Sequence, residues 1–134
     1  MRGDFRQNGH HDLRGPALEC RIELVSDCSV VHVSGEVDLA TVHLLNKALD
    51  TALSASRPII VSFAKATYID SAGIHALLLA KRRHHTTFAA AALAPTLKKI
   101  FELTGIDKII PLYDTLDAAL STLCVPSASG GTSP

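Results

Sequence analysis

The stretch TYIDSAGIHALL, Thr67–Leu78, lies at a junction between two predicted elements. Before it, the run IIVSFA (59–64) is almost continuously apolar, which is typical of a strand buried on both faces of a parallel sheet. After it, apolar residues recur at helical spacing. Asp70, Ser71 and Gly73 lie between the strand and the helix. They either start the helix in the ordinary way or present the Ser71 hydroxyl to a partner.

Outward from this junction, the chain alternates between strand and helix patterns. Single-residue alternation predicts strands, and apolar residues spaced three and four apart predict amphipathic helices. Pro95 suits a first helical turn, and Gly105 suits a helix C-cap. Pro111 restricts the last strand to a sheet edge. The predicted strands are 18–24, 30–35, 59–64, 88–93 and 108–113, and the predicted helices are 40–55, 71–83, 95–104 and a last helix capped by Asp114.

This order predicts one small α/β domain. We expect a mostly parallel sheet of four to five strands, with an N-terminal hairpin that turns at Asp27 to Ser29, and about four helices. The folded unit spans residues 17–125. Residues 1–16 are polar and predict a flexible arm, and residues 126–134, PSASGGTSP, predict a disordered tail.

Composition excludes several functional classes. The 134 residues include 13 basic and 13 acidic side chains, so no net charge favours nucleic acid as a direct partner. The N-terminus has no apolar segment typical of a signal peptide. The longest apolar runs are about ten residues, well short of a membrane span. We therefore expect a cytoplasmic protein with no direct contact to nucleic acid or membrane.

Two strand-to-helix junctions carry unusual polar residues: GEVDLAT (35–41) and YIDSAG (68–73). The first amides of a helix have no partner within the helix, so a side-chain oxygen caps them or a phosphate binds them. Ser71 and Asp38 suit capping as ordinary N-cap residues. Glycine in a first helical turn costs up to about 1 kcal/mol relative to alanine. Gly73 therefore indicates a group that approaches the backbone closely.

Three segments together carry a family resemblance. GEVDLAT, YIDSAGIHALL and LKKIFELTGIDKI, in this order and spacing, resemble a STAS domain, and more narrowly the bacterial anti-sigma factor antagonists. The similarity covers residues 18–123, which is nearly the whole folded unit. The D-S-x-G motif at 70–73 is a weak signal alone, but three motifs in register with the predicted topology are specific.

The resemblance implies partner switching. In that family, the unmodified antagonist binds an anti-sigma factor that is also a serine kinase of the GHKL ATPase type, and binding releases the sigma factor. The kinase then phosphorylates the serine of the D-S-x-G motif, here Ser71, and the complex loosens. A phosphatase, expected to be of PP2C type, resets the switch. ATP belongs to the kinase, so no cofactor is expected on this chain.

By the same resemblance, a group of residues is expected to form the partner-binding face. Thr41 and the turn at Thr104 and Gly105 are the weaker members, since helix packing and C-capping are the favoured explanations for them. The expected binding residues are Asp38, Thr41, Asp70, Ser71, Ala72, Gly73, Thr104 and Gly105. The alternative is a STAS interaction or ligand-sensing module that is not switched by phosphate.

A hydrolase built from Ser71, Asp70 and His75 is a weaker interpretation. His75 lies one helical turn beyond Ser71, Asp70 is its sequence neighbour, and no G-x-S-x-G motif is present. The sequence therefore predicts a protein that is not an enzyme.

The histidines do not predict a metal site. His10, His11 and Asp12 fall in the predicted arm, and the adjacent His84 and His85 lack the i,i+4 spacing of a helical metal site. We expect the pair at 84 and 85 to be exposed where a helix ends.

Cys20, Cys28 and Cys124 match no metal-binding spacing. We expect three reduced thiols, with a redox-switching disulfide as the alternative and its pairing left open.

Overall fold

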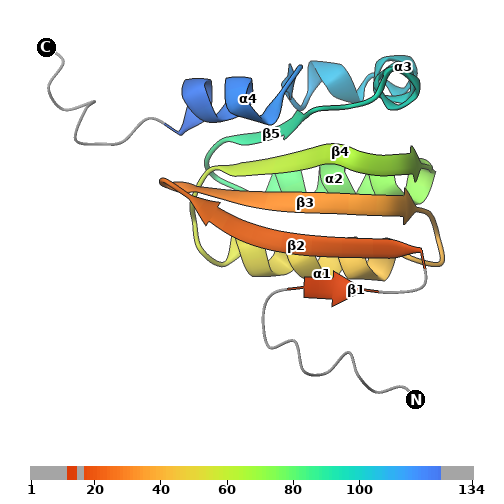
Figure 1. The fold of residues 1–134 in the computed structure, drawn as a ribbon, viewed down its shortest axis with the longest axis horizontal. Helices are drawn as coiled ribbons and strands as arrows, with labels where there is room; N and C mark the ends of the chain where they lie inside the picture. The colour runs from red at the N-terminus through yellow and green to blue at the C-terminus, as the bar shows by residue number, and fades with distance from the viewer. Residues whose placement is uncertain (1–11, 15–16, 125–134) are drawn as a thin grey trace, which may run out of the picture.

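The computed structural model describes residues 12–14 and 17–124, which form one sheet and its covering helices (Figure 1). The strands lie in the order β1-β2-β3-β4-β5-β6. In chain order the elements are β1 (Asp12–Arg14), β2 (Leu18–Val25), β3 (Cys28–Val37), α1 (Val42–Leu53), β4 (Ile59–Ile69), α2 (Ser71–Arg83), β5 (Phe88–Ala91), α3 (Pro95–Thr104), the 3-10 helix η2 (Ile106–Lys108), β6 (Leu112–Tyr113) and α4 (Leu116–Leu123).

The predicted fold class is confirmed. β2 and β3 form an antiparallel hairpin, and β3, β4, β5 and β6 run parallel, with β6 at the edge as Pro111 predicts. One strand was not predicted: residues 12–14, inside the expected arm, pair antiparallel with β2. A three-residue edge strand is too short for periodicity to reveal. The rest of the predicted arm and the tail from 126 lie outside the described residues.

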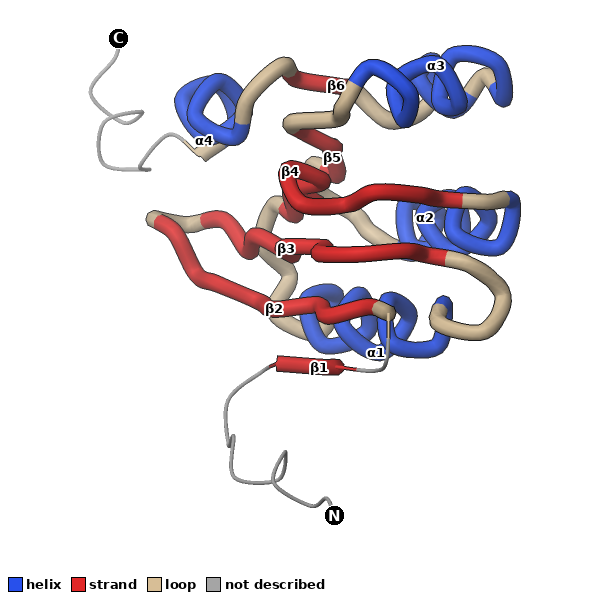
Figure 2. Tube along the Cα trace, turned by 45° about the vertical axis from the view of Figure 1, so that its right-hand side comes forward, coloured by secondary structure: helices blue, strands red, loops and turns tan. Residues whose placement is uncertain are grey.

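α1 and α2 lie side by side on one face of the sheet (Figures 1 and 2). The main core fills the space beneath them and includes Ile59, Val61 and Phe63 of β4. Phe101 of α3 extends this core with an edge-to-face contact to Phe63, at a ring-centroid distance of 5.6 Å. The apolar stripes of the helices thus become buried as their spacing predicts.

A second, smaller apolar cluster lies on the opposite face. Ile60 contributes to it, and because side chains alternate along a strand, Ile60 faces away from Ile59 and Val61. α4 covers this cluster through Ala119. None of the described helices is both long and apolar enough to cross a bilayer.

Two local expectations are wrong by one residue each. The hairpin turns at Ser26 and Asp27, where Ser26 has φ +53°, so Cys28 already belongs to β3. Thr115, and not Asp114, caps α4 by accepting a hydrogen bond from the amide of Ala118 at 3.0 Å. Both corrections reflect one-residue shifts, which propensity does not resolve.

His84 is a further correction, because it is buried and not exposed as expected. Its Nε2 atom lies 2.8 Å from the carbonyl oxygen of Arg57 and 2.8 Å from the hydroxyl of Thr86. The side chain therefore ties the end of α2 to the loop before β4. His85 is exposed as expected.

The expectation of three reduced thiols is wrong. Cys28, at the start of β3, and Cys124, just after α4, form a disulfide, with their Cα atoms 5.6 Å apart. Cys20 is free and buried. The alternative of a disulfide is thus the correct one, and the fold supplies the pairing that the sequence left open.

Candidate functional site

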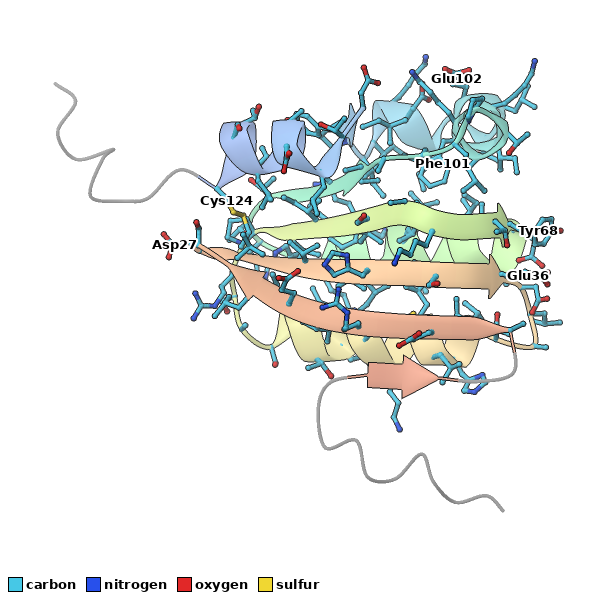
Figure 3. All side chains as sticks on the ribbon, in the orientation of Figure 1. Asp27, Glu36, Tyr68, Phe101, Glu102 and Cys124 are labelled. Carbon is cyan, nitrogen blue, oxygen red and sulfur yellow. A yellow bond between two sulfur atoms is a disulfide. The ribbon has the colours of Figure 1, made fainter. Side chains whose placement is uncertain are left out.

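The two polar junctions meet at one edge of the sheet. β3 and β4 are parallel neighbours, so the loop after Val37 and the loop after Ile69 leave the sheet at the same end. The backbone amide of Asp70 donates to the carbonyl oxygen of Val37 at 3.1 Å, which joins the junctions directly. In Figure 3, Glu36 and Tyr68 mark this end, and Asp27 and Cys124 mark the opposite end. We call the end at Asp38 and Ser71 the junction edge.

Asp70, and not Ser71, is the N-cap of α2. Its Oδ1 atom accepts from the amides of Ala72 and Gly73 at 2.9 and 3.4 Å. The expectation that Ser71 itself caps the helix is therefore wrong. Ser71 is the first helical residue and is exposed, and its hydroxyl has no hydrogen-bond partner within the described part of the chain. Because Asp70 satisfies the helix amides, the Ser71 hydroxyl is left for an external group.

Asp38 organises the neighbouring loop. Its carboxylate accepts from the amides of Ala40 and Thr41 at 2.9 and 3.1 Å, and its carbonyl accepts from the amide of Val42 at 2.8 Å. Asp38 thus accepts backbone hydrogen bonds as a capping residue does, but within the turn just before α1. Thr41 holds the N-cap position of the helix itself. The carboxylate fixes the loop that forms one wall of the junction edge.

Thr41 is buried beneath this loop and supports it through hydrogen bonds. Its hydroxyl donates to the carbonyl of Glu36 at 2.8 Å and accepts from the amide of Asp38 at 3.0 Å. The side chain is only 6% exposed. Thr41 therefore positions Asp38 from below, in agreement with the packing role favoured for it from the sequence.

The close approach predicted at Gly73 is made from inside the protein. Gly73 is buried, and an added Cβ would lie 2.6 Å from Cγ1 of Ile69 and 2.7 Å from Cγ1 of Val37. Glycine at this position lets the first turn of α2 rest on the ends of β3 and β4. The groups that approach its backbone are core side chains, which the sequence interpretation did not foresee.

Two exposed apolar side chains border the junction edge and were missed from the sequence. Leu39, in the loop after β3, is 79% exposed, and Tyr68, near the end of β4, is 46% exposed. An open depression beside Ser71 is lined by Leu39, Asp70, Ser71, Ala72 and His75. A large apolar side chain in the turn between Asp38 and Thr41 was the available signal. Exposed apolar and aromatic side chains beside a free hydroxyl suit a protein partner.

Thr104 and Gly105 end α3 on the other side of β4. Gly105 has φ +79°, and its amide donates to the carbonyl of Glu102, so the predicted C-cap is confirmed. The hydroxyl of Thr104 donates to the carbonyl of Ile100 at 2.8 Å. Within the described residues, no hydrogen bond joins this turn to Asp38 or Ser71.

His75 lines the depression beside Ser71, but it makes no hydrogen bond to Ser71 or Asp70 among the described residues. The base-to-hydroxyl contact of a hydrolytic triad is therefore not formed here. The site consists of an exposed hydroxyl at a helix N-terminus, a capping carboxylate and an apolar border.

Another hollow lies on the sheet face between β2, β3 and β4. Its lining includes Arg21, His32, Ser62 and Lys65. His32 contacts the carboxylate of Glu23 at 2.8 Å. The hollow carries charges of both signs, and its polar groups are typical of a solvated sheet face.

Comparison with known proteins shows which proteins share this fold. The family description "STAS domain" matches residues 20–119. The chain is 31% identical to an anti-sigma factor antagonist from Mycobacterium paratuberculosis, with a TM-score of 0.77, covering 83% of this chain and 98% of that one.

More distant structures share the fold. The Bacillus cell fate determinant SpoIIAA in its phosphorylated form is 21% identical, with a TM-score of 0.59, covering 77% of this chain and 97% of that one. A sulfate transporter family protein from Wolinella succinogenes is 18% identical, with a TM-score of 0.61, covering 72% of this chain and 84% of that one.

Proposed function

The chain belongs to the STAS domain family, and we propose that it is an anti-sigma factor antagonist that phosphorylation of Ser71 switches off. The observation that carries the proposal is the Ser71 hydroxyl, which is exposed and unpartnered among the described residues while Asp70 caps α2. A serine that capped its own helix would have to give up that bond on modification. Here the capping bond and the phosphoacceptor belong to different residues.

The effect of the phosphate follows from charge. Phosphorylation adds a charge of about −1.5 to −2 and three strong acceptor oxygens. The N-terminus of α2 favours negative charge, so the fold itself tolerates the group. Across a dry interface the same charge is costly, and the neighbouring Asp70 carboxylate adds to the repulsion. The modified chain therefore releases its partner without unfolding.

The partner in this proposal is an anti-sigma factor of the GHKL serine-kinase type. The kinase supplies the ATP, and a PP2C-type phosphatase removes the phosphate and restores binding. In this mechanism the unmodified chain occupies the anti-sigma factor, frees the sigma factor and regulates transcription from the cytoplasm. The similarity to an anti-sigma factor antagonist at 31% identity supports this choice of partner.

The proposed contact surface is the junction edge. Asp38, Asp70, Ser71 and Ala72 face the partner there, and Thr41 and Gly73 hold the two loops in place from beneath. The turn at Thr104 and Gly105 forms the outer margin of the surface.

The experiment that tests the proposal is a phosphorylation assay with the full chain. Purified protein is incubated with ATP and each GHKL-type anti-sigma factor of the source organism, and the phosphate is mapped by mass spectrometry. We expect one phosphate, at Ser71, and none on Ser71→Ala. Binding by a kinase that leaves Ser71 unmodified would favour the STAS module without a phospho-switch, a role that the wider family fold also accommodates.

Leu39→Ala is expected to weaken binding to the anti-sigma factor by about tenfold or more, since a buried apolar anchor contributes at least 1 to 2 kcal/mol at an interface. The side chain is 79% exposed in the free protein, so its truncation leaves the core intact. Titration calorimetry gives the Kd, and a denaturation curve confirms unchanged stability. Ile109→Ala is the matched control, because Ile109 is also an exposed aliphatic residue (52%) but lies in the loop before β6. Equal losses in the two variants would argue against the junction edge as the docking surface.

A further inference from the structure

Cys28 and Cys124 join parts of the chain that are far apart in sequence. The disulfide spans 96 positions and connects the first residue of β3 to the residue just after α4. It lies at the end of the sheet opposite the junction edge, as the labels of Cys124 and Tyr68 show in Figure 3. The link is thus separate from the Ser71 site.

α4, which this disulfide holds in place, buries few of its side chains against the rest of the domain. α4 is eight residues long, and Ala119 is its buried residue. Leu116, Leu120 and Leu123 are only partly buried where they pack on the second apolar cluster. Short elements with few buried apolar contacts open at low free-energy cost, so a covalent tie at one end has a large influence on α4.

The chemical setting distinguishes these cysteines from the third. Cys20 lies inside the main core, where burial, with a smaller contribution from Glu19, raises the pKa of its thiol to about 12. That thiol stays protonated and unreactive, since the thiolate is the nucleophile. Cys124 is 7% exposed and follows the last turn of a short helix, so fraying of that turn brings its sulfur to solvent.

We propose that Cys28 and Cys124 form a reversible redox clasp that controls the docking of α4 on the sheet. In the oxidised form the disulfide fixes α4 over Ile60 and Ala91. A dithiol reductant attacks one sulfur through a mixed disulfide and leaves as its own disulfide, and both cysteines become thiols. Two electrons and two protons pass from the reductant to the protein, and oxidation by a small disulfide reverses the exchange.

Reduction then frees the C-terminal end of the domain. α4 undocks more often and uncovers the apolar surface around Ile60 and Ala91. The main core and the junction edge keep their contacts, because α1, α2 and the opposite face of β4 pack in the main cluster. Redox state and phosphorylation therefore act on opposite ends of the same sheet.

Hydrogen exchange on the full chain tests this inference. The protein is compared after oxidation with oxidised glutathione and after reduction with dithiothreitol, and peptides are followed by mass spectrometry. We expect amides of residues 116–123 to exchange about tenfold or more faster after reduction, whereas amides of residues 71–83 stay unchanged. Reoxidation restores the slow exchange.

Two variants control the experiment. Cys124→Ser should show the fast exchange of α4 in both conditions, and Cys20→Ser should respond to dithiothreitol like the original chain. If Cys124→Ser fails to fold, the reversible response of the unaltered chain still decides the question. Two free thiols at Cys28 and Cys124 after oxidation, or equal exchange of residues 116–123 in both states, would overturn the clasp. The outcome does not depend on whether Ser71 is phosphorylated.

Discussion

Ser71→Glu is expected to bind the anti-sigma factor at least about 100-fold more weakly than the unaltered chain, whereas Ser71→Ala keeps its affinity. A 100-fold loss corresponds to only about 2.8 kcal/mol. A carboxylate beside Asp70 supplies this through desolvation and like-charge repulsion. Because the N-terminus of α2 stabilises negative charge, the glutamate variant should fold normally.

The measurement is a calorimetric titration of both variants against the anti-sigma factor, with circular dichroism to confirm the fold. Ser121→Glu is the matched control, since Ser121 is exposed on α4, away from the junction edge. It should bind like the unaltered chain. The same Kd for Ser71→Ala and Ser71→Glu would reject electrostatic release, even if Ser71 is phosphorylated in the assay.

Gly35→Ala is expected to lower the free energy of unfolding by about 3 kcal/mol or more, because strain and overpacking each cost 1 to 3 kcal/mol. Gly35 has φ +109°, and an added Cβ would collide with the carbonyl oxygen of Ala17. That carbonyl accepts the amide of Glu36 at 2.8 Å. The substitution therefore strains the backbone and pushes apart two strands just before the loop of Asp38.

Gly105→Ala separates the cost of backbone strain from the cost of the steric contact with Ala17. Gly105 also has positive φ, at +79°, but nothing lies within 4 Å of an added Cβ. We expect a loss of only about 1 kcal/mol, the conformational cost alone. Urea denaturation of both variants gives the comparison. A Gly35→Ala loss no greater than that of Gly105→Ala would show that the contact with Ala17 relaxes at little cost.

Sequence alone determined the local elements of this protein and the position of its site. Strand alternation and helical spacing are local properties, so β2, β3, β5 and the four helices lie close to where the patterns predict them. The predicted strand 108–113 is wrong over its first half, because Ile106–Lys108 form a 3-10 helix and β6 is only Leu112–Tyr113, and β4 runs beyond the predicted 59–64 to Ile69. The polar junctions at Asp38 and Ser71 were visible because capping and glycine residues interrupt apolar runs. The parallel order of β3 and β4, also expected from the sequence, brings them to one edge.

Only the tertiary structure decided which groups those residues contact. The register of the first turn of α2 made Asp70 the cap and left Ser71 free, a difference of one residue that propensity cannot resolve. Gly73 meets Ile69 and Val37 because three elements converge there. Cys28 and Cys124 pair because α4 returns across the sheet, and no pattern in the sequence records the distance between segments 96 positions apart. Periodicity fixes which side of an element is apolar, but packing decides what that side meets.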